Sequence, residues 1–133
     1  MSAQYRLKTD RYSSHRQITN YILSHYPNGA FVLDVGCGEG NIGTLLTKQF
    51  ILTGIDISRT ALARSPDNYV SRIAADLNVF DWKLNKRFDI ICAADVLEHL
   101  VDPETVVNKF SRLLKPNGIL IVSLPNIAFI SVR

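Results

Sequence analysis

The chain has 133 residues, a net charge of +3 and 47% hydrophobic residues. This length and composition fit one globular domain with a single core. Its basic residues are scattered, whereas a nucleic-acid surface needs them clustered, so a nucleic-acid partner is not expected. No apolar run reaches the roughly 18 residues of a membrane span, and the first residues lack the apolar core of a signal peptide. Two cysteines outside any C-x-x-C pair fit reduced thiols and no zinc site, and we expect a cytoplasmic protein.

Helical and extended segments alternate from the N-terminus onward. Residues 10–26 place Ile18, Tyr21 and Ile22 at helical spacing, and a Pro-Asn-Gly turn at 27–29 ends this helix. The elements expected after it are a strand at 30–35, a helix at 41–49, a strand at 52–55, a helix at 59–64, strands at 69–74 and 88–93, a helix at 103–114 and a strand at 119–124. This alternation predicts an α/β sandwich around a mostly parallel sheet.

We divide the chain into a helical segment over residues 1–29 and a domain over residues 30–133. The helical segment carries Tyr5, Tyr12 and Tyr21, and two interpretations of it stay open. It forms a lid over a binding site, or it packs against the sheet as any amphipathic helix does.

Acidic residues stand at or near the carboxyl ends of four successive predicted strands: Asp34, Asp56, Asp76 and Asp95. One such acid can simply cap a helix. Four of them would crowd one edge of the sheet, and ligands of parallel α/β sheets bind beyond the carboxyl ends of the strands. The pattern therefore predicts a binding site at that edge.

The most informative motif is D-V-G-C-G-E-G at residues 34–40, between a strand and a helix that begins at Asn41. Glycines at three alternate positions leave no side chain between the backbone and a ligand. A tight turn there directs N–H groups and the positive end of the following helix toward a small polar molecule. We expect a nucleoside-containing cofactor.

The spacing and charge of this turn discriminate between cofactors. The dinucleotide fingerprint is G-x-G-x-x-G, but Asn41 stands where its third glycine belongs. Asp34 and Glu39 would repel a pyrophosphate, and they suit a ligand with a cationic amino-acid end, such as S-adenosylmethionine. A nucleotide-dependent oxidoreductase is disfavoured on the same grounds.

D-V-G-C-G-E-G resembles the first motif of class I S-adenosylmethionine-dependent methyltransferases. Four later segments resemble further motifs of that family, in the same order: G-I-D-I-S, A-A-D-L, F-D-I-I-C-A-A-D-V-L-E-H-L-V-D-P and L-K-P-N-G-I-L-I-V-S-L-P-N. The L-E-H-x-x-D-P and S-x-P-N details are similar to the branch with ubiquinone-type O-methyltransferases and methyltransferases of methionine or cell-surface glycan synthesis. The resemblance implies a Rossmann-like three-layer sandwich and methyl transfer to a small-molecule or glycan-precursor acceptor.

The resemblance also implies which residues bind the cofactor: Asp34, Gly36, Cys37, Gly38, Gly40, Asp56, Ile57, Asp76, Leu77, Ala94 and Asp95. Asp56 would offer two acceptor oxygens to the ribose hydroxyls, and Ile57 would lie against the adenine. The alternative for Asp56 is a capping or turn acid.

The other implied roles divide between the two ends of the cofactor. Asp34 and the backbone of the glycine turn would hold the methionine end, while Ala94 and Asp95 would border the transferred methyl. Asp76 would accept from the adenine amino group and Leu77 would cover its face. The alternative for Asp76 is a solvated loop acid.

Catalysis asks little of the protein, because a sulfonium is already a good leaving group and alignment supplies most of the acceleration. A base helps when the acceptor is a hydroxyl or an acidic amine, and Glu98 and His99 are the candidates. His99 is expected to be the only histidine near the site, with His15 and His25 in the N-terminal helix. A structural role for the Glu-His pair stays the alternative, and no metal site is expected, because adjacent helical side chains diverge.

The family's sheet normally has seven strands, with an antiparallel pair at the end, and the last strands are not found here. We expect a piece of a longer protein, with residues 126–133 beginning a further helix. The fifth strand would then have a free edge, through which a homodimer could form. A non-catalytic S-adenosylmethionine-binding module or subunit is the alternative to an enzyme.

Overall fold

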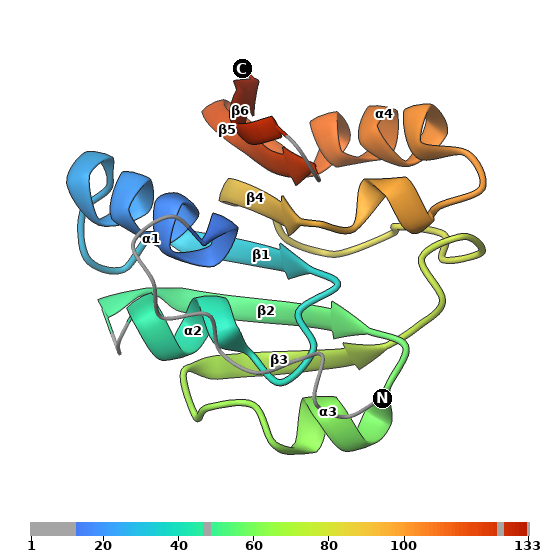
Figure 1. Ribbon diagram of the computed structural model, residues 1–133, viewed down its shortest axis with the longest axis horizontal. Helices are drawn as coiled ribbons and strands as arrows, with labels where there is room; N and C mark the ends of the chain where they lie inside the picture. The colour runs from blue at the N-terminus through green and yellow to red at the C-terminus, as the bar shows by residue number, and fades with distance from the viewer. Residues whose placement is uncertain (1–12, 47–48, 125–126, 133) are drawn as a thin grey trace.

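The computed structural model describes residues 13–46, 49–124 and 127–132, which form a sheet with helices on both faces (Figure 1). The strand order is β3-β2-β1-β4-β5-β6. The strands are β1 (Phe31–Val35), β2 (Ile51–Asp56), β3 (Tyr69–Ala74), β4 (Phe88–Ala94), β5 (Leu114–Leu124) and β6 (Ile127–Val132). The first five are parallel to one another, which confirms the mostly parallel α/β fold.

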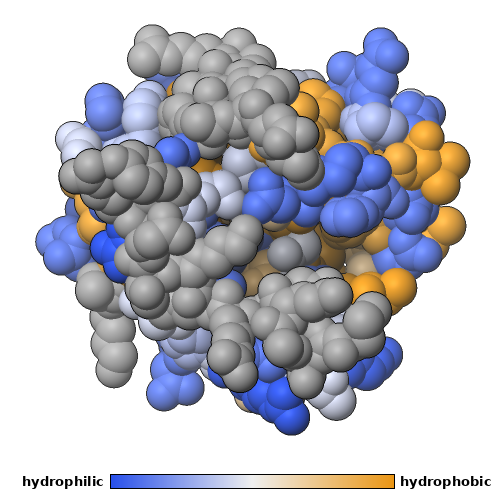
Figure 2. All heavy atoms as spheres, viewed as in Figure 1, coloured by the Kyte–Doolittle hydropathy of each residue, from blue (hydrophilic) through white to orange (hydrophobic). Residues whose placement is uncertain are grey.

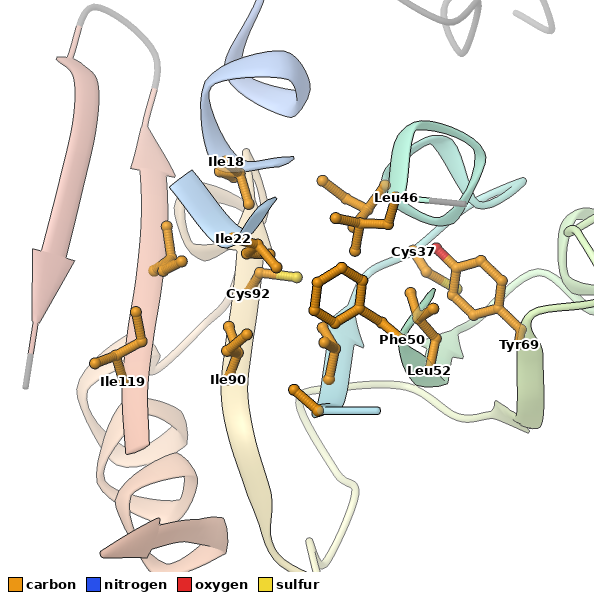
Figure 3. Packing of buried hydrophobic residues seen from close by; sticks show 14 of the residues in the cluster. Ile18, Ile22, Cys37, Leu46, Phe50, Leu52, Tyr69, Ile90, Cys92 and Ile119 are labelled. Atoms are coloured by element: carbon orange, nitrogen blue, oxygen red, sulfur yellow. The ribbon is translucent and has the colours of Figure 1, made fainter. Parts of the chain in front are cut away.

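Each face of the sheet has its own hydrophobic cluster. On one face, α1 (Ser14–His25), α2 (Asn41–Leu46) and α3 (Arg59–Ala63) cover strand residues such as Val32 and Ile90, and Figure 3 shows this packing. On the other face, α4 (Pro103–Leu113) covers strand residues such as Leu33 and Ile91. Strands with both faces buried read as continuous apolar runs, which is why β1 and β4 were recognisable.

Helix α1 begins where Ser13 accepts a hydrogen bond from the Arg16 N–H through its hydroxyl. Ile18 and Ile22 are fully buried against the sheet, so the helix packs as part of the core. Tyr5 and Tyr12, which the lid interpretation invokes, lie outside the described residues.

The C-terminal end corrects one expectation. Residues 127–132 read I-A-F-I-S-V and form strand β6, antiparallel to β5, in place of the start of a helix. Their β-branched and aromatic residues favour a strand once an open sheet edge is available. The fifth strand therefore has neighbours on both sides, and β6 is the edge strand of the sheet at this end; a homodimer through the sheet edge stays a prediction.

Two further bounds differ from the expectation. Strand β5 begins at Leu114, and the expected turn around Asn117 becomes an irregularity within it, with φ +66° at Asn117. Helix α2 is described to Leu46, and residues 47 and 48 lie outside the described ranges.

The connection from β3 to β4, residues 75–87, is fully described and contains neither helix nor strand. Trp82 anchors it: the indole is 5% exposed and makes edge-to-face contacts with Phe80 and with Phe110 of α4, each at 5.0 Å between centroids. This loop thus covers part of one face of the sheet where a helix would otherwise pack. None of the helices in the described part of the chain has the length and apolar character of a membrane span.

Candidate functional site

The glycine turn lies between β1 and α2 and is built from backbone that only glycine adopts easily. Gly36, Gly38 and Gly40 have φ values of +68°, +55° and +84°. A Cβ on Gly36 would lie 2.5 Å from a methyl carbon of Val96, so this position also has no room for a side chain. The motif is therefore required by backbone geometry as well as by any ligand.

The N–H groups of the turn bond within the protein. Those of Gly36 and Cys37 both donate to the carbonyl of Ile55, and that of Gly38 donates to the Asp56 carboxylate. The expectation that such N–H groups point at a ligand does not hold for these three. These hydrogen bonds instead hold the turn against β2, and the turn gives the cleft a surface without side chains.

A cleft of about 560 Å³ opens at the carboxyl ends of the parallel strands, beside the glycine turn. The residues that line it are His15, Gly36, Cys37, Gly38, Glu39, Asn41, Asp56, Ile57, Asp76, Leu77, Asn78, Ala94, Asp95, Val96, His99 and Leu100. All but two of the residues expected to bind the cofactor are among them. Asp34 and Gly40 are the exceptions within the described residues.

Asp56 is held firmly at the end of β2. One carboxylate oxygen accepts from the Gly38 N–H at 2.8 Å, and the other accepts from the Ser58 N–H at 2.9 Å. Each carboxylate oxygen accepts two hydrogen bonds, so both retain capacity toward the cleft. The geometry gives a pair of oriented acceptors beside the glycine turn. Ser58, and not Asp56, caps α3.

Asp95 lies at the corner where three elements meet. Its φ of +54° is uncommon for a residue with a side chain, and such strain gathers at functional sites. Its carboxylate accepts from the hydroxyls of Ser14 in α1 (2.8 Å) and Ser123 in β5 (3.1 Å). These bonds fix α1 against the cleft.

Asp76 organises the loop that follows β3. Its carboxylate accepts from the Asn78 N–H at 2.9 Å, which forms a local turn. The Asn78 side chain in turn accepts from the Val101 N–H at 2.9 Å and joins this loop to the one after β4. Val79 and Val101 are 80% and 88% exposed, and Figure 2 shows hydrophobic surface on the side where these loops lie.

Asp34 is 2% exposed and lies beneath the turn. Its carboxylate accepts from the Tyr69 hydroxyl at 2.6 Å and from the Cys92 thiol at 3.8 Å. Burial raises the pKa of Asp34 to about 7, although the bonds from Tyr69 and Cys92 lower it. Burial likewise raises the pKa of the Cys37 and Cys92 thiols, so both stay protonated.

The two candidate bases lie side by side, but only one of them lines the cleft. His99, at the end of the short 3-10 helix η3 (Leu97–His99), lines it, whereas Glu98 does not. His99 Nε2 lies 3.6 Å from Glu98 Oε1, so the two form an ion pair when His99 is protonated, at a distance too long for a hydrogen bond.

His15 of α1 also lines the cleft, which corrects the expectation that His99 is the only histidine near it. No local pattern pointed to His15, because its placement depends on how α1 docks through Ser14. Asn78 and Leu100 were missed for a related reason, since they lie in loops without a periodic pattern.

The cleft is acidic. Four carboxylates line it, from Glu39, Asp56, Asp76 and Asp95, and no Lys or Arg does so among the described residues. Arg64 does not line the cleft but pairs with Glu39 at 3.1 Å, with both side chains exposed. Such a cleft repels phosphates and favours cationic groups. Within the described ranges, no three His, Cys, Asp or Glu side chains are grouped to hold a metal ion.

Comparisons with known proteins agree with this geometry. A ubiquinone biosynthesis O-methyltransferase of Rickettsia canadensis is 34% identical over 116 residues, or 82% of this chain and 49% of that protein. One of Haemophilus ducreyi is 34% identical over 121 residues, or 80% of this chain and 51% of that protein. The chain thus spans about half the length of these curated relatives.

Solved structures share the fold. The N-methyltransferase NodS from Bradyrhizobium japonicum, in complex with S-adenosyl-L-homocysteine, gives a TM-score of 0.73 at 26% identity, covering 89% of this chain and 64% of that one. The cyclase SpnF gives a TM-score of 0.65 at 25% identity, covering 80% of this chain and 43% of that one. Residues 7–132 match the family model described as a methyltransferase domain. The glycine turn and the acidic residues at the ends of the parallel strands agree with this match, and the chain belongs to the methyltransferase domain family.

Proposed function

We propose that this chain is the cofactor-binding part of an S-adenosylmethionine-dependent methyltransferase that acts on a small molecule or glycan precursor. The observation that carries the proposal is the Asp56 carboxylate, held between the Gly38 and Ser58 N–H groups at the edge of an acidic cleft. Two fixed acceptors suit the two hydroxyls of a ribose, and the absence of Lys and Arg among the described lining residues disfavours a pyrophosphate.

The residues present fit an adenosyl cofactor. Asp56 would hold the ribose, while Ile57, Asp76 and Leu77 would surround the adenine. Gly36 and Gly38 line the cleft without side chains, which leaves room for the methionine end. The acidic lining favours an ammonium and a sulfonium in the cleft.

When bound, S-adenosylmethionine supplies a methyl group on a sulfonium that needs no further activation. The chain's own residues then have three tasks. Ala94 and Asp95 border the methyl end, the loops after β3 and β4 exclude water, and His99 accepts a proton from the acceptor. Relatives whose names specify O- and N-methyltransferases differ in the acceptor atom, and the cleft itself does not select one.

The proposal includes cytoplasmic location, which two free and buried thiols support, and a small-molecule rather than a nucleic-acid partner. The boundary near residue 29 is part of the proposal, and so are both interpretations of the N-terminal segment. The Ser14–Asp95 hydrogen bond supports a lid over the cleft, and the buried Ile18 and Ile22 support packing on the sheet. The non-catalytic binding module is the second candidate, and SpnF, named as a cyclase, illustrates that this fold is not tied to one activity.

Calorimetric titration with S-adenosylmethionine, S-adenosylhomocysteine and NAD tests the cofactor. We expect binding of both adenosyl ligands and no heat with NAD. A folded protein that is silent to all three, or that prefers NAD, would overturn the proposal.

Asp56→Ala is expected to weaken S-adenosylmethionine binding by about 2 kcal/mol, through the loss of charge-assisted hydrogen bonds. The same titration measures it, with circular dichroism to verify folding. Asp67→Ala is the matched control, because Asp67 is an exposed acid outside the cleft. If Asp56→Ala and the control bind equally well, Asp56 does not hold the ribose.

His99→Ala is expected to keep its cofactor affinity and to lose about 100-fold or more in turnover, because general-base catalysis contributes that much. The assay follows S-adenosylhomocysteine release with candidate hydroxyl and amine acceptors. Turnover that survives in His99→Ala would remove His99 as the base, and His15→Ala would then be the next variant.

A further inference from the structure

Tyr69, the first residue of β3, lies buried beneath the glycine turn. Its side chain is 0% exposed and reaches toward Cys37, as Figure 3 shows. Three glycines surround its ring: a Cβ on Gly40, Gly43 or Gly54 would lie 2.7, 2.2 or 2.9 Å from a ring carbon. The ring therefore occupies a space that these three positions leave open.

The Tyr69 hydroxyl joins three elements. It donates to Asp34 Oδ2 at 2.6 Å and accepts from the Gly43 N–H at 3.0 Å. The Gly43 N–H belongs to the first turn of α2, where backbone N–H groups have no partner within the helix. One phenol thus connects the end of β1, the start of α2 and the start of β3, on both sides of the glycine turn.

The charge of Asp34 is poorly compensated. The titratable groups that face it are Tyr69 from β3, Cys92 from β4, Cys37 from the turn and Asp56 from β2. Arg72 is the cation that acts in this region, on Cys37, but its guanidinium donates to Ser65 and to the Pro66 carbonyl. Asp34 therefore depends on hydrogen bonds, above all from Tyr69, to remain a carboxylate.

We propose that Tyr69 is a positioning residue for the cofactor site: its hydroxyl keeps Asp34 charged beneath the glycine turn, and cofactor affinity falls when Asp34 takes up a proton. The carboxylate attracts a cationic ligand through a medium of low dielectric constant. A proton on Oδ2 would set two donors against each other, and the hydroxyl would have to turn away from its present partners. This inference rests on the proposed function.

The pH dependence has a definite sign. Because the pKa of Asp34 is raised to about 7, the ligand-free protein carries the charged form above that pH and the neutral form below it. Affinity for S-adenosylmethionine should be highest in the alkaline range and fall as the pH drops through 7. Loss of the Tyr69 bond raises the pKa of Asp34 further, so the fall should occur at a higher pH.

The test is calorimetric titration with S-adenosylmethionine between pH 5.5 and 9 for four proteins: wild type, Tyr69→Phe, Asp34→Asn and Tyr26→Phe. We expect Tyr69→Phe to bind about tenfold more weakly at pH 7 and to recover as the pH rises. Asp34→Asn should bind weakly at every pH, and Tyr26→Phe, a tyrosine at the far end of α1, should follow the wild type.

A second measurement separates this inference from the proposed function. Carbon-13 NMR of the Asp34 carboxyl in the ligand-free protein reports its titration directly, and Tyr69→Phe should shift the midpoint upward. A wild type that binds no S-adenosylmethionine at any pH would defeat the proposed function, while the NMR titration still decides what Tyr69 does to Asp34. An unchanged midpoint in Tyr69→Phe, or pH-independent wild-type affinity, would overturn the inference.

Discussion

Gly38→Val is expected to reduce S-adenosylmethionine affinity by more than about 100-fold, which corresponds to roughly 3 kcal/mol. Gly38 has φ +55°, a conformation that a β-branched residue tolerates badly. Its N–H also holds Asp56 at 2.8 Å, so a turn that relaxes to accommodate valine releases the carboxylate proposed to hold the ribose as well. Calorimetric titration measures the loss.

Gly29→Val provides a matched control for this variant. Gly29 has φ +87° and no heavy atom within 4 Å of an added Cβ, and it precedes β1, at the end of the sheet away from the cleft. It should therefore show a comparable loss of stability, about 1–3 kcal/mol, without loss of affinity. If the two variants lose affinity equally, the effect of Gly38→Val reports general destabilisation and the turn has no special part in binding.

Asp34→Asn is expected to stabilise the protein at alkaline pH. The folded-state pKa of Asp34 is about 7, against 3.8 for an exposed Asp, so folding favours the protonated form. Its stabilising contribution is complete below pH 3.8 and is lost as the pH rises to 7. By linkage this loss amounts to about 4 kcal/mol, which a neutral asparagine avoids.

Urea denaturation at pH 5 and pH 8 measures this effect as the change in unfolding free energy. The wild type should lose stability between these two values, and Asp34→Asn should lose less. Asp67→Asn, which replaces an exposed acid, should follow the wild type. A wild type and an Asp34→Asn variant with parallel pH profiles would show that Asp34 is not the titrating group.

The two expectations for Asp34 point in opposite directions. The asparagine variant should be more stable and should bind the cofactor less well. A buried acid without a cation is a cost to folding, and such costs are retained where binding needs them. Measuring both stability and affinity on Asp34→Asn would show whether Asp34 is an acid that lowers stability and is needed for binding.

The sequence was sufficient for the main helices and strands and for much of the cleft, because these depend on local patterns. Asp56 and Asp76 follow recognisable apolar strands, and parallel strands end at one edge, so their proximity followed from topology. The glycine spacing also located the turn from residues adjacent in the chain.

Contacts between distant segments could not be foreseen. Tyr69 reaches Asp34 across 35 positions of the chain, and nothing in its local sequence distinguishes it from an ordinary strand residue. Ser14 and Asp95 are separated by 81 positions. That His99 lines the cleft and Glu98 does not depends on a 3-10 helix of three residues, which is too short to leave a periodic signal.

The β3–β4 loop has a spectroscopic consequence. Trp82 is the only tryptophan in the sequence, so tryptophan fluorescence from this protein arises from that loop alone. The indole is nearly buried against Phe110, and the same loop supplies Asp76, Leu77 and Asn78 to the cleft. A change in its emission on ligand addition would report a change in this part of the cleft, without any label or engineered probe.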